Sequence, residues 1–282
     1  MTNKMLPQLS ERLQTVADMV TEGRTVADIG TDHGFVPIYL IGTGKASRVI
    51  AMDVRSGPLD RAKSHVIEYN YETQIECRLS DGMEKLLPGE AQTITCAGMG
   101  GPLMQKIIEK GNPRELGITE MILQPQSDIV QFRMYLRDND YEIVDEQLIL
   151  EEGKYYMPMK IRVKCGKADT DKCEAVDKLT KSTQNDDIII GDILKSPSDA
   201  YSEGVKILVE SIGISVDEAT RACYRFGPVN IRNKSEALYS LLCHDKKVCE
   251  GILPKLSKEE HADRYNEVSN ELSDITNVLK LF

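Results

Sequence analysis

Apolar runs of five or so residues recur along the first part of the chain, and each is followed by a polar turn. Near-continuous apolar runs are typical of strands that are covered on both faces. Apolar residues at three- and four-residue steps follow most of these runs and also occupy residues 6–20, which predicts amphipathic helices there. The predicted strands cover residues 25–30, 48–54, 75–79, 93–97 and 121–123.

Two further apolar stretches, 141–150 and 155–163, alternate as strands with one covered face do. The link between them, residues 151–154, is too short for a crossover helix, so the pair is predicted to form an antiparallel hairpin. Strands alternating with helices, closed by this hairpin, predict an α/β fold with a doubly wound sheet of seven strands.

The composition changes after residue 165. Residues 166–187 are polar and rich in charge, whereas 200–216 and the leucine-spaced region 238–281 have helical periodicity. A break near Pro254 predicts two long helices packed as an antiparallel hairpin. We expect a domain over 1–165, a connection or insertion of unassigned role over 166–222, and a helical domain over 223–282.

Composition excludes several classes of protein. Seven cysteines without CxxC spacing argue against a disulfide framework and against a zinc site, so no metal is expected. No apolar run approaches the ~20 residues that span a bilayer, and residues 1–10 lack an export signal. A formal net charge of −10 argues against a protein that coats nucleic acid nonspecifically but allows a local basic groove. We expect a cytoplasmic protein without a membrane partner, and a monomer.

Residues 26–34, Val-Ala-Asp-Ile-Gly-Thr-Asp-His-Gly, combine a strand end, a glycine turn and the start of a helix. This arrangement forms a cradle for a nucleotide-like ligand. Dinucleotide-binding loops have a glycine where this loop has Asp32, and an aspartate there would repel a pyrophosphate. NAD and FAD are therefore disfavoured.

S-adenosylmethionine suits these residues better, because it has no phosphate and carries a sulfonium and an ammonium group. Asp32 can face either cationic group, and Asp53, at the end of the second strand, can accept both ribose hydroxyls. Asp81 with Gly82 can contact the adenine amino group, and the bare backbone of 97–101 leaves room for methyl donor and acceptor to meet. An acid or glycine at each of several strand ends is more specific than any single motif.

The chain resembles the bacterial tRNA (adenine-22-N1)-methyltransferases, the TrmK family, over about 1–165 and 223–282. The matching motifs are Leu9–Leu13, Ala27–His33, Gly57-Pro58, Asp81-Gly82, Ala97–Gly101, Leu123–Gln126, an acid pair between 148 and 153, and Phe226–Pro228. The chain departs from the family at Asp53, where a glutamate is more common, and in the extra residues 166–222.

The resemblance implies a Rossmann-like, seven-stranded class I methyltransferase sheet with a C-terminal α-helical, coiled-coil-like domain. It also implies S-adenosyl-L-methionine as cofactor, tRNA as partner and methyl transfer to N1 of adenine 22. The lysines of the helical domain, such as Lys246 and Lys247, are a candidate tRNA contact. Two other functions stay open: a methyltransferase acting on rRNA, another nucleobase or a small molecule, and a non-catalytic module that binds S-adenosylmethionine or RNA.

The expected site follows from these arguments. The candidate cofactor-binding residues are Arg12, Asp28, Gly30, Thr31, Asp32, His33, Gly34, Asp53, Asp81, Gly82, Ala97 and Gly98. The candidate catalytic residues are Asp32, Gly98, Met99 and Gly100, with Asp32 as the carboxylate nearest the methyl group. Arg12 rests on the resemblance. Asp28 serves either as a structural acid or as a ligand contact, Asp32 could instead only form the turn, and His33 is expected to belong to the binding loop rather than to catalyse.

Overall fold

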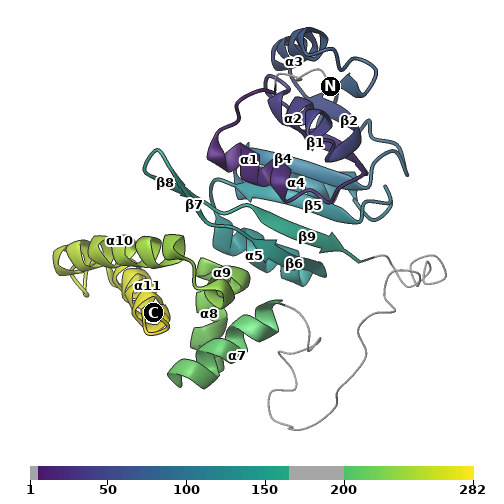
Figure 1. Cartoon of the computed structure of the whole chain (residues 1–282). Coiled ribbons are helices and arrows are strands. Elements are labelled where there is room, and N and C mark those ends of the chain that lie inside the picture. Colours follow the sequence, from purple (N-terminus) through teal and green to yellow (C-terminus); the bar gives the residue numbers. More distant parts are fainter. Residues whose placement is uncertain (1–5, 165–199) are drawn as a thin grey trace, which may run out of the picture. The chain divides into compact units, whose positions relative to one another are not determined.

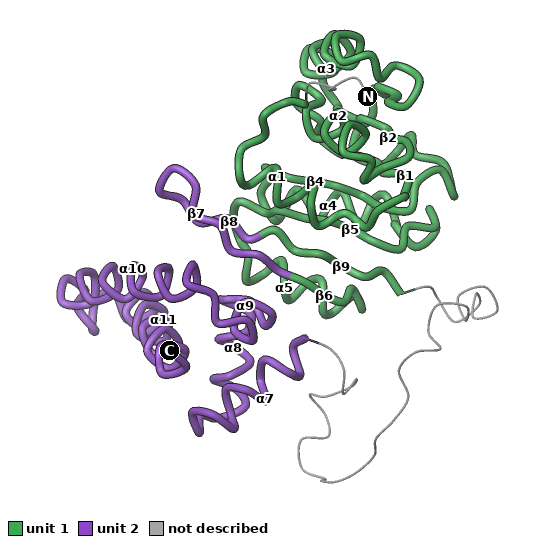
Figure 2. The backbone as a smooth tube through the Cα atoms, in the orientation of Figure 1, with its two compact units in different colours: residues 1–145, 158–191 green, residues 146–157, 192–282 purple. Residues whose placement is uncertain are grey.

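A computed structural model describes residues 6–164 and 200–282. It divides the chain into two compact units, residues 1–145 with 158–191 and residues 146–157 with 192–282 (Figure 2). These ranges differ from the expected domains in two places, because residues 146–157 and 200–222 both group with the C-terminal helices. The expected 166–222 connection lies outside the described residues up to position 199.

The first unit contains a seven-stranded sheet in the order β3-β2-β1-β4-β5-β9-β6 (Figure 1). The strands β1 to β5 are parallel, and β9 runs antiparallel to β5. The predicted doubly wound, seven-stranded sheet is therefore confirmed. The strands are β1 Arg24–Ile29, β2 Ala46–Asp53, β3 Ile75–Leu79, β4 Thr93–Met99, β5 Glu120–Pro125, β6 Tyr141–Glu146 and β9 Met159–Val163.

The predicted C-terminal hairpin is correct in direction but wrong in extent. Each of its two strands is interrupted, and the tip forms a separate antiparallel pair of β7 Ile149–Glu151 and β8 Lys154–Tyr156. Pro158 contributes to the break, because a proline has no N–H to donate to a neighbouring strand. The turn at Glu152-Gly153 has positive φ at both residues, as a tight two-residue hairpin requires.

Helices α1 Glu11–Asp18 and α2 Phe35–Gly42 pack against the sheet around one apolar core. Val16 of α1, Ile38 of α2 and Val49 of β2 are each at most 1% exposed in that core. The predicted helix over 6–20 is shorter than expected, because the chain is extended at Ser10. The remaining helices of this unit are α3 Ser56–Glu68, α4 Gly101–Gly111 and α5 Ile129–Asp138.

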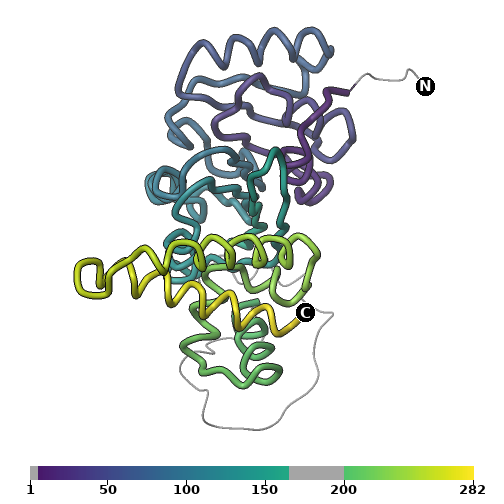
Figure 3. The backbone as a smooth tube through the Cα atoms, turned by 90° about the vertical axis from the view of Figure 1, so that its left-hand side faces the viewer, coloured from purple at the N-terminus to yellow at the C-terminus, as the bar shows by residue number. Residues whose placement is uncertain are grey.

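The second unit is helical apart from the β7–β8 pair. Helices α10 and α11 pack against each other, as predicted, and run side by side in Figure 3. A 3-10 turn that contains Pro254 follows α10 and ends it. The Asp274 carboxylate of α11 is fully buried and lies 2.7 Å from a guanidinium nitrogen of Arg221, which joins α11 to α8. The helical elements are α7 Ala200–Ile212, α8 Val216–Phe226, α9 Pro228–Asn233, α10 Glu236–Ile252, η1 Leu253–Lys255 and α11 Ala262–Leu279.

Candidate functional site

The loops that follow the parallel strands meet at the carboxyl edge of the sheet. The backbone N–H groups of Gly30 and Thr31 donate to the carbonyl of Met52, at 2.8 and 2.9 Å, and Ser80 donates to the carbonyl of Asp53 at 2.9 Å. The ends of β1, β2 and β3 are thus tied together by main-chain hydrogen bonds. The candidate residues were predicted to lie at the ends of neighbouring strands, and in the structure the loops after β1, β2 and β3 do meet at one edge of the sheet.

Asp28 joins β1 to β4. Its carboxylate is 8% exposed and accepts a hydrogen bond of 2.6 Å from the hydroxyl of Thr95. Burial raises the pKa of Asp28, and the Thr95 hydrogen bond partly opposes that shift. The side chain is therefore an acid held beneath the loop in an environment that disfavours its charge.

Gly30 supplies a bare α-carbon at the turn itself. Its φ of +78° belongs to the left-handed region, where glycine is favoured. A β-carbon on Gly30 would lie 2.1 Å from the terminal methyl carbon of Met99, so that methionine packs on the glycine. The buried Thr31 follows, and Gly34 packs against Ala62 of α3.

Asp32 and His33 face outward from this turn. Asp32 lies 3.0 Å from a guanidinium nitrogen of Arg61 and 3.6 Å from Nε2 of His33, and its side chain is 59% exposed. The His33 carbonyl oxygen accepts a hydrogen bond from Nδ1 of His65 at 2.8 Å, which fixes the loop on α3. Phe35 stacks on His65 with ring centroids 4.6 Å apart.

Asp53 ends β2 as an almost fully buried carboxylate, 5% exposed. Its Oδ1 accepts a hydrogen bond of 2.7 Å from the backbone N–H of Arg55. The hydrogen bond orients the side chain at the start of the loop that leads into α3. A carboxylate held in this way can accept hydroxyl hydrogen bonds through its other oxygen.

Asp81 and Gly82 follow β3. Asp81 is an exposed acid that lies 3.0 Å from the ammonium group of Lys110 in α4. Both residues line a cavity of about 60 Å³ together with Leu103 and Ile107.

The last three residues of β4 and the residue after it, Ala97 to Gly100, form the candidate catalytic backbone. A β-carbon on Gly98 would lie 3.8 Å from Nε2 of Gln126 and 3.9 Å from a terminal guanidinium nitrogen of Arg12. The carbonyl of Met99 accepts from the backbone N–H of Gln126 at 2.9 Å. Gly100 precedes α4 as its N-cap residue.

Arg12 is held at this edge by Gln124, whose side-chain oxygen accepts a hydrogen bond of 3.0 Å from it. Gln124 is completely buried at the end of β5. The role predicted for Arg12 rested only on the resemblance. No role was predicted for Gln124 or Gln126, although two amides at the end of an apolar run were a visible signal.

One predicted residue, Asp32, makes no direct contact with the predicted catalytic backbone among the described residues. In the part of the chain that the structure describes, no hydrogen bond or ion pair joins Asp32 to Gly98, Met99 or Gly100, and its side chain instead lies beside Arg61 and His33. Among the described residues there is no cluster of acids, histidines or cysteines that could hold a metal ion. No helix in residues 6–164 or 200–282 has the length and apolar content needed to cross a membrane.

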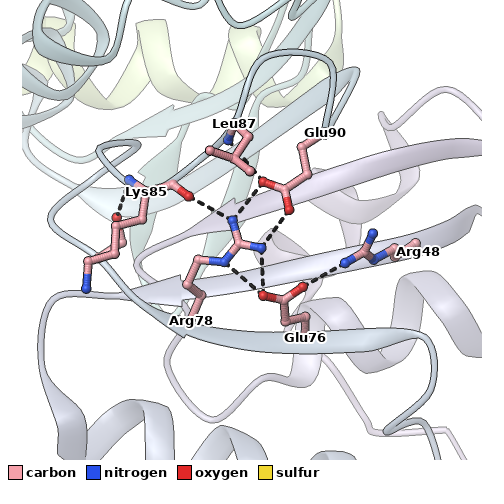
Figure 4. Close-up of polar contacts among 7 residues, drawn as sticks. Arg48, Glu76, Arg78, Lys85, Leu87 and Glu90 are labelled. Atoms are coloured by element: carbon pink, nitrogen blue, oxygen red, sulfur yellow. Dashed lines mark hydrogen bonds and ion pairs between the residues drawn. The ribbon is translucent and has the colours of Figure 1, made fainter.

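A separate ionic cluster lies beside this edge on β3 (Figure 4). The guanidinium group of Arg78 forms two hydrogen bonds to Glu90, of 2.7 and 2.6 Å, and a third of 2.6 Å to Glu76. The two hydrogen bonds that Glu90 accepts from Arg78 lower the pKa of Glu90 to about 2. The cluster joins β3 to the segment before β4 through Glu90, and therefore has a structural role.

Comparisons with known proteins agree with this architecture. The "Methyltransferase domain" family model matches residues 9–159, more than half of the chain. A tRNA (adenine(22)-N(1))-methyltransferase of Bacillus subtilis is 41% identical over 149 residues, which are 53% of this chain and 63% of that protein. The chain thus spans less than two thirds of that relative's length in the match.

Two solved structures extend the similarity beyond the first unit. The B. subtilis M1A22 tRNA methyltransferase TrmK superposes with a TM-score of 0.71 at 27% identity, covering 96% of this chain and 99% of that one. A Streptococcus pneumoniae protein in complex with S-adenosyl-L-methionine shares the fold, with a TM-score of 0.69, 23% identity and coverage of 96% and 100%. The expected Rossmann-like methyltransferase sheet with a C-terminal helical region is confirmed. The chain belongs to the methyltransferase-domain family, and the resemblance to the tRNA (adenine-22-N1)-methyltransferases that its motifs carry is confirmed.

Proposed function

We propose that this protein transfers a methyl group from S-adenosylmethionine to N1 of adenine 22 in tRNA. One observation carries the proposal: the acids and glycines that this reaction needs occupy the carboxyl ends of adjacent parallel strands, tied together by main-chain hydrogen bonds. The carboxyl edge of an open α/β sheet is where ligands bind. The named activity of the B. subtilis relatives supports the same substrate.

The residues fit S-adenosylmethionine. Gly30 permits the left-handed turn of the loop, Asp53 is a buried and oriented carboxylate, and Asp32 is an exposed negative charge. When bound, the cofactor supplies a methyl group activated by a positively charged sulfur. We assign Asp53 to the ribose hydroxyls, Asp81 with Gly82 to the adenine of the cofactor, and the Asp28–Gly34 loop to its methionine end.

The remaining assignments concern the acceptor. Adenine N1 attacks through a ring lone pair, so no side chain has to remove a proton beforehand, and correct alignment contributes most. The methylated ring is a cation, which a nearby carboxylate stabilises. We assign that carboxylate to Asp32, which can leave Arg61 at small cost because this ion pair is exposed. Gly98, Met99 and Gly100 shape the slot for the acceptor base.

The second unit offers a surface for tRNA. An open groove of about 850 Å³ is lined by Lys234, Lys246 and Lys247 and by the exposed rings of Tyr239 and Phe282. Glu236 and Glu250 also line the groove, so it is positively charged only near its lysines. Phosphate contacts by lysines act within about a Debye length, which reconciles this groove with the acidic net charge of the chain.

A direct assay tests the proposal. The full chain is incubated with labelled S-adenosylmethionine and an unmodified tRNA transcript, and the nucleosides are then identified by mass spectrometry. We expect N1-methyladenosine in the transcript and none when adenine 22 is replaced by guanine. Methylation only of rRNA or a small molecule would select another acceptor, and cofactor binding without any transfer would indicate a binding module. A cytoplasmic location and a monomeric state remain predictions.

A further inference from the structure

Gln126 lies at the end of β5 with its backbone fixed to the neighbouring loop. Its N–H donates to the carbonyl of Met99 at 2.9 Å. Its side chain is exposed, and the amide has no hydrogen-bond partner within residues 6–164 and 200–282. The amide is therefore an anchored donor and acceptor that is available to a ligand at the carboxyl edge.

The amide borders the bare backbone of Gly98. Its Nε2 lies 3.8 Å from the position a β-carbon of Gly98 would take, and Arg12 lies 3.9 Å from the same position. The next residue, Met99, reaches back to cover Gly30 of the cradle. Gly98 thus lies next to Gln126 and is followed by a residue that contacts the candidate cofactor loop, and a flat ring lying on Gly98 would come within reach of this amide.

The chemistry of N1 methylation restricts how the base can be recognised. N1 has to face the methyl group, so the edge of adenine that normally pairs with another base is occupied by the reaction. The remaining polar edge carries the N6 amino donor and the N7 acceptor. A glutamine amide matches this pair, because its oxygen accepts from N6 and its nitrogen donates to N7. Guanine presents two acceptors there, O6 and N7, and one of them would meet the amide oxygen.

We propose that Gln126 selects adenine at the reaction site by binding its N6 and N7 groups while N1 stays free to attack. The inference rests on the proposed function and adds the group that reads the acceptor base. A base extruded from its stack is commonly recognised by hydrogen bonds inside a pocket. Gln126 is thus a specificity-determining residue rather than part of the cofactor site.

The test uses two tRNA substrates that differ in one atom. One has adenosine at position 22 and the other has 7-deazaadenosine, which lacks the N7 acceptor but keeps N1 and the N6 amino group. For the unaltered chain we expect a single-turnover rate roughly 10- to 100-fold lower on the 7-deaza substrate. Gln126→Ala should be slower by a similar factor on adenosine and should show no further loss on 7-deazaadenosine.

Two further measurements make the outcome decisive. Gln126→Ala should bind S-adenosylhomocysteine with unchanged affinity by calorimetry, and Gln105→Ala, which removes an amide bonded to Glu109 on α4, should behave as the unaltered chain. Three outcomes would overturn the inference without touching the proposed function. They are equal rates of the unaltered chain on both substrates, a rate of Gln126→Ala that still falls on 7-deazaadenosine by the same factor, and a loss of cofactor affinity in Gln126→Ala. Absence of transfer by the unaltered chain to either tRNA would overturn the proposed function, and the inference with it.

Discussion

The terminal methyl carbon of Met99 packs directly on the α-carbon of Gly30, within 2.1 Å of the point where a β-carbon would stand. The turn after β1 and the last residue of β4 therefore meet at a residue without a side chain. Because the contact depends on that missing side chain, Gly30 is expected to be sensitive to the smallest substitution.

Gly30→Ala should lose about 1–2 kcal/mol of stability from the left-handed backbone conformation alone. The overlap with Met99 adds to this cost and displaces the loop, so affinity for S-adenosylhomocysteine should fall as well. Thermal unfolding and calorimetry measure the two effects. Adding Met99→Ala to Gly30→Ala should recover part of the stability, and a double variant no more stable than Gly30→Ala would show that the contact is unimportant.

Asp32→Ala should lower the turnover of methyl transfer roughly 100-fold or more, because a carboxylate near the developing cation is removed. The thermal midpoint should barely change, since the side chain is 59% exposed and its partner Arg61 is also exposed. Asp60→Ala, which removes an exposed acid on α3 that pairs with Lys63, is the matched control. Turnover in Asp32→Ala equal to that of the control would remove Asp32 from the chemistry.

Asp28→Asn should make the cofactor-free protein more stable at neutral pH. Burial raises the pKa of Asp28 above its ordinary value of 3.8, so its carboxylate costs stability increasingly as pH rises past 3.8. Asparagine keeps an oxygen to accept from Thr95 and has no charge to bury. Denaturant unfolding should show the gain growing between pH 4 and pH 7, and a difference that is independent of pH would contradict it.

The same variant separates the two possible roles of Asp28. If the carboxylate contacts the cofactor, as we propose, Asp28→Asn should weaken S-adenosylhomocysteine binding roughly tenfold, the scale of one charge-assisted hydrogen bond. Calorimetry at pH 7 measures this directly. Unchanged affinity would leave Asp28 with a structural role only.

Glu90→Gln should remove about 2 kcal/mol of stability at neutral pH, because the double hydrogen bond to Arg78 loses its charge. The pKa of Glu90 is lowered from 4.5 to about 2, so its contribution is complete above pH 4.5 and is lost as pH falls toward 2. The two proteins should therefore converge in acid. Glu109→Gln, on the exposed part of α4, should show neither effect, and a Glu90→Gln deficit that persists at pH 2 would contradict this assignment.

Exchanging Lys246 and Lys247 for alanine should weaken tRNA binding and reduce its dependence on salt. Each lost phosphate contact lowers the slope of log affinity against log salt by about 1. Fluorescence anisotropy over a salt series measures both quantities. Lys206→Ala on α7, which removes an exposed lysine near Glu210, serves as the control. If the double variant has the same slope of log affinity against log salt as this control, the groove does not contact tRNA.

The sheet and the cradle were predictable because both depend on local patterns. Strands covered on both faces appear in the sequence as unbroken apolar runs, and the turn at Gly30 appears as a glycine between two acids. The interruption at Pro158 was missed because alternation of apolar residues continues on either side of it. The Arg12–Gln124 and Asp32–Arg61 pairs were also missed, since each joins residues on different elements and neither partner changes the periodicity around it.

The β7–β8 pair belongs to the helical unit but lies within the chain of the sheet unit. Truncating the chain after the sheet therefore does not remove the whole helical unit. A protein ending at residue 164 would keep residues 146–157 but lose their companions, among them the Val229 N–H that donates to Glu146 and the His244 ring beside Tyr155. Strands β6 and β9 would then carry the β7–β8 pair without these partners. A catalytic fragment would have to be designed by excising 146–157 as well and rejoining the sheet with a new turn.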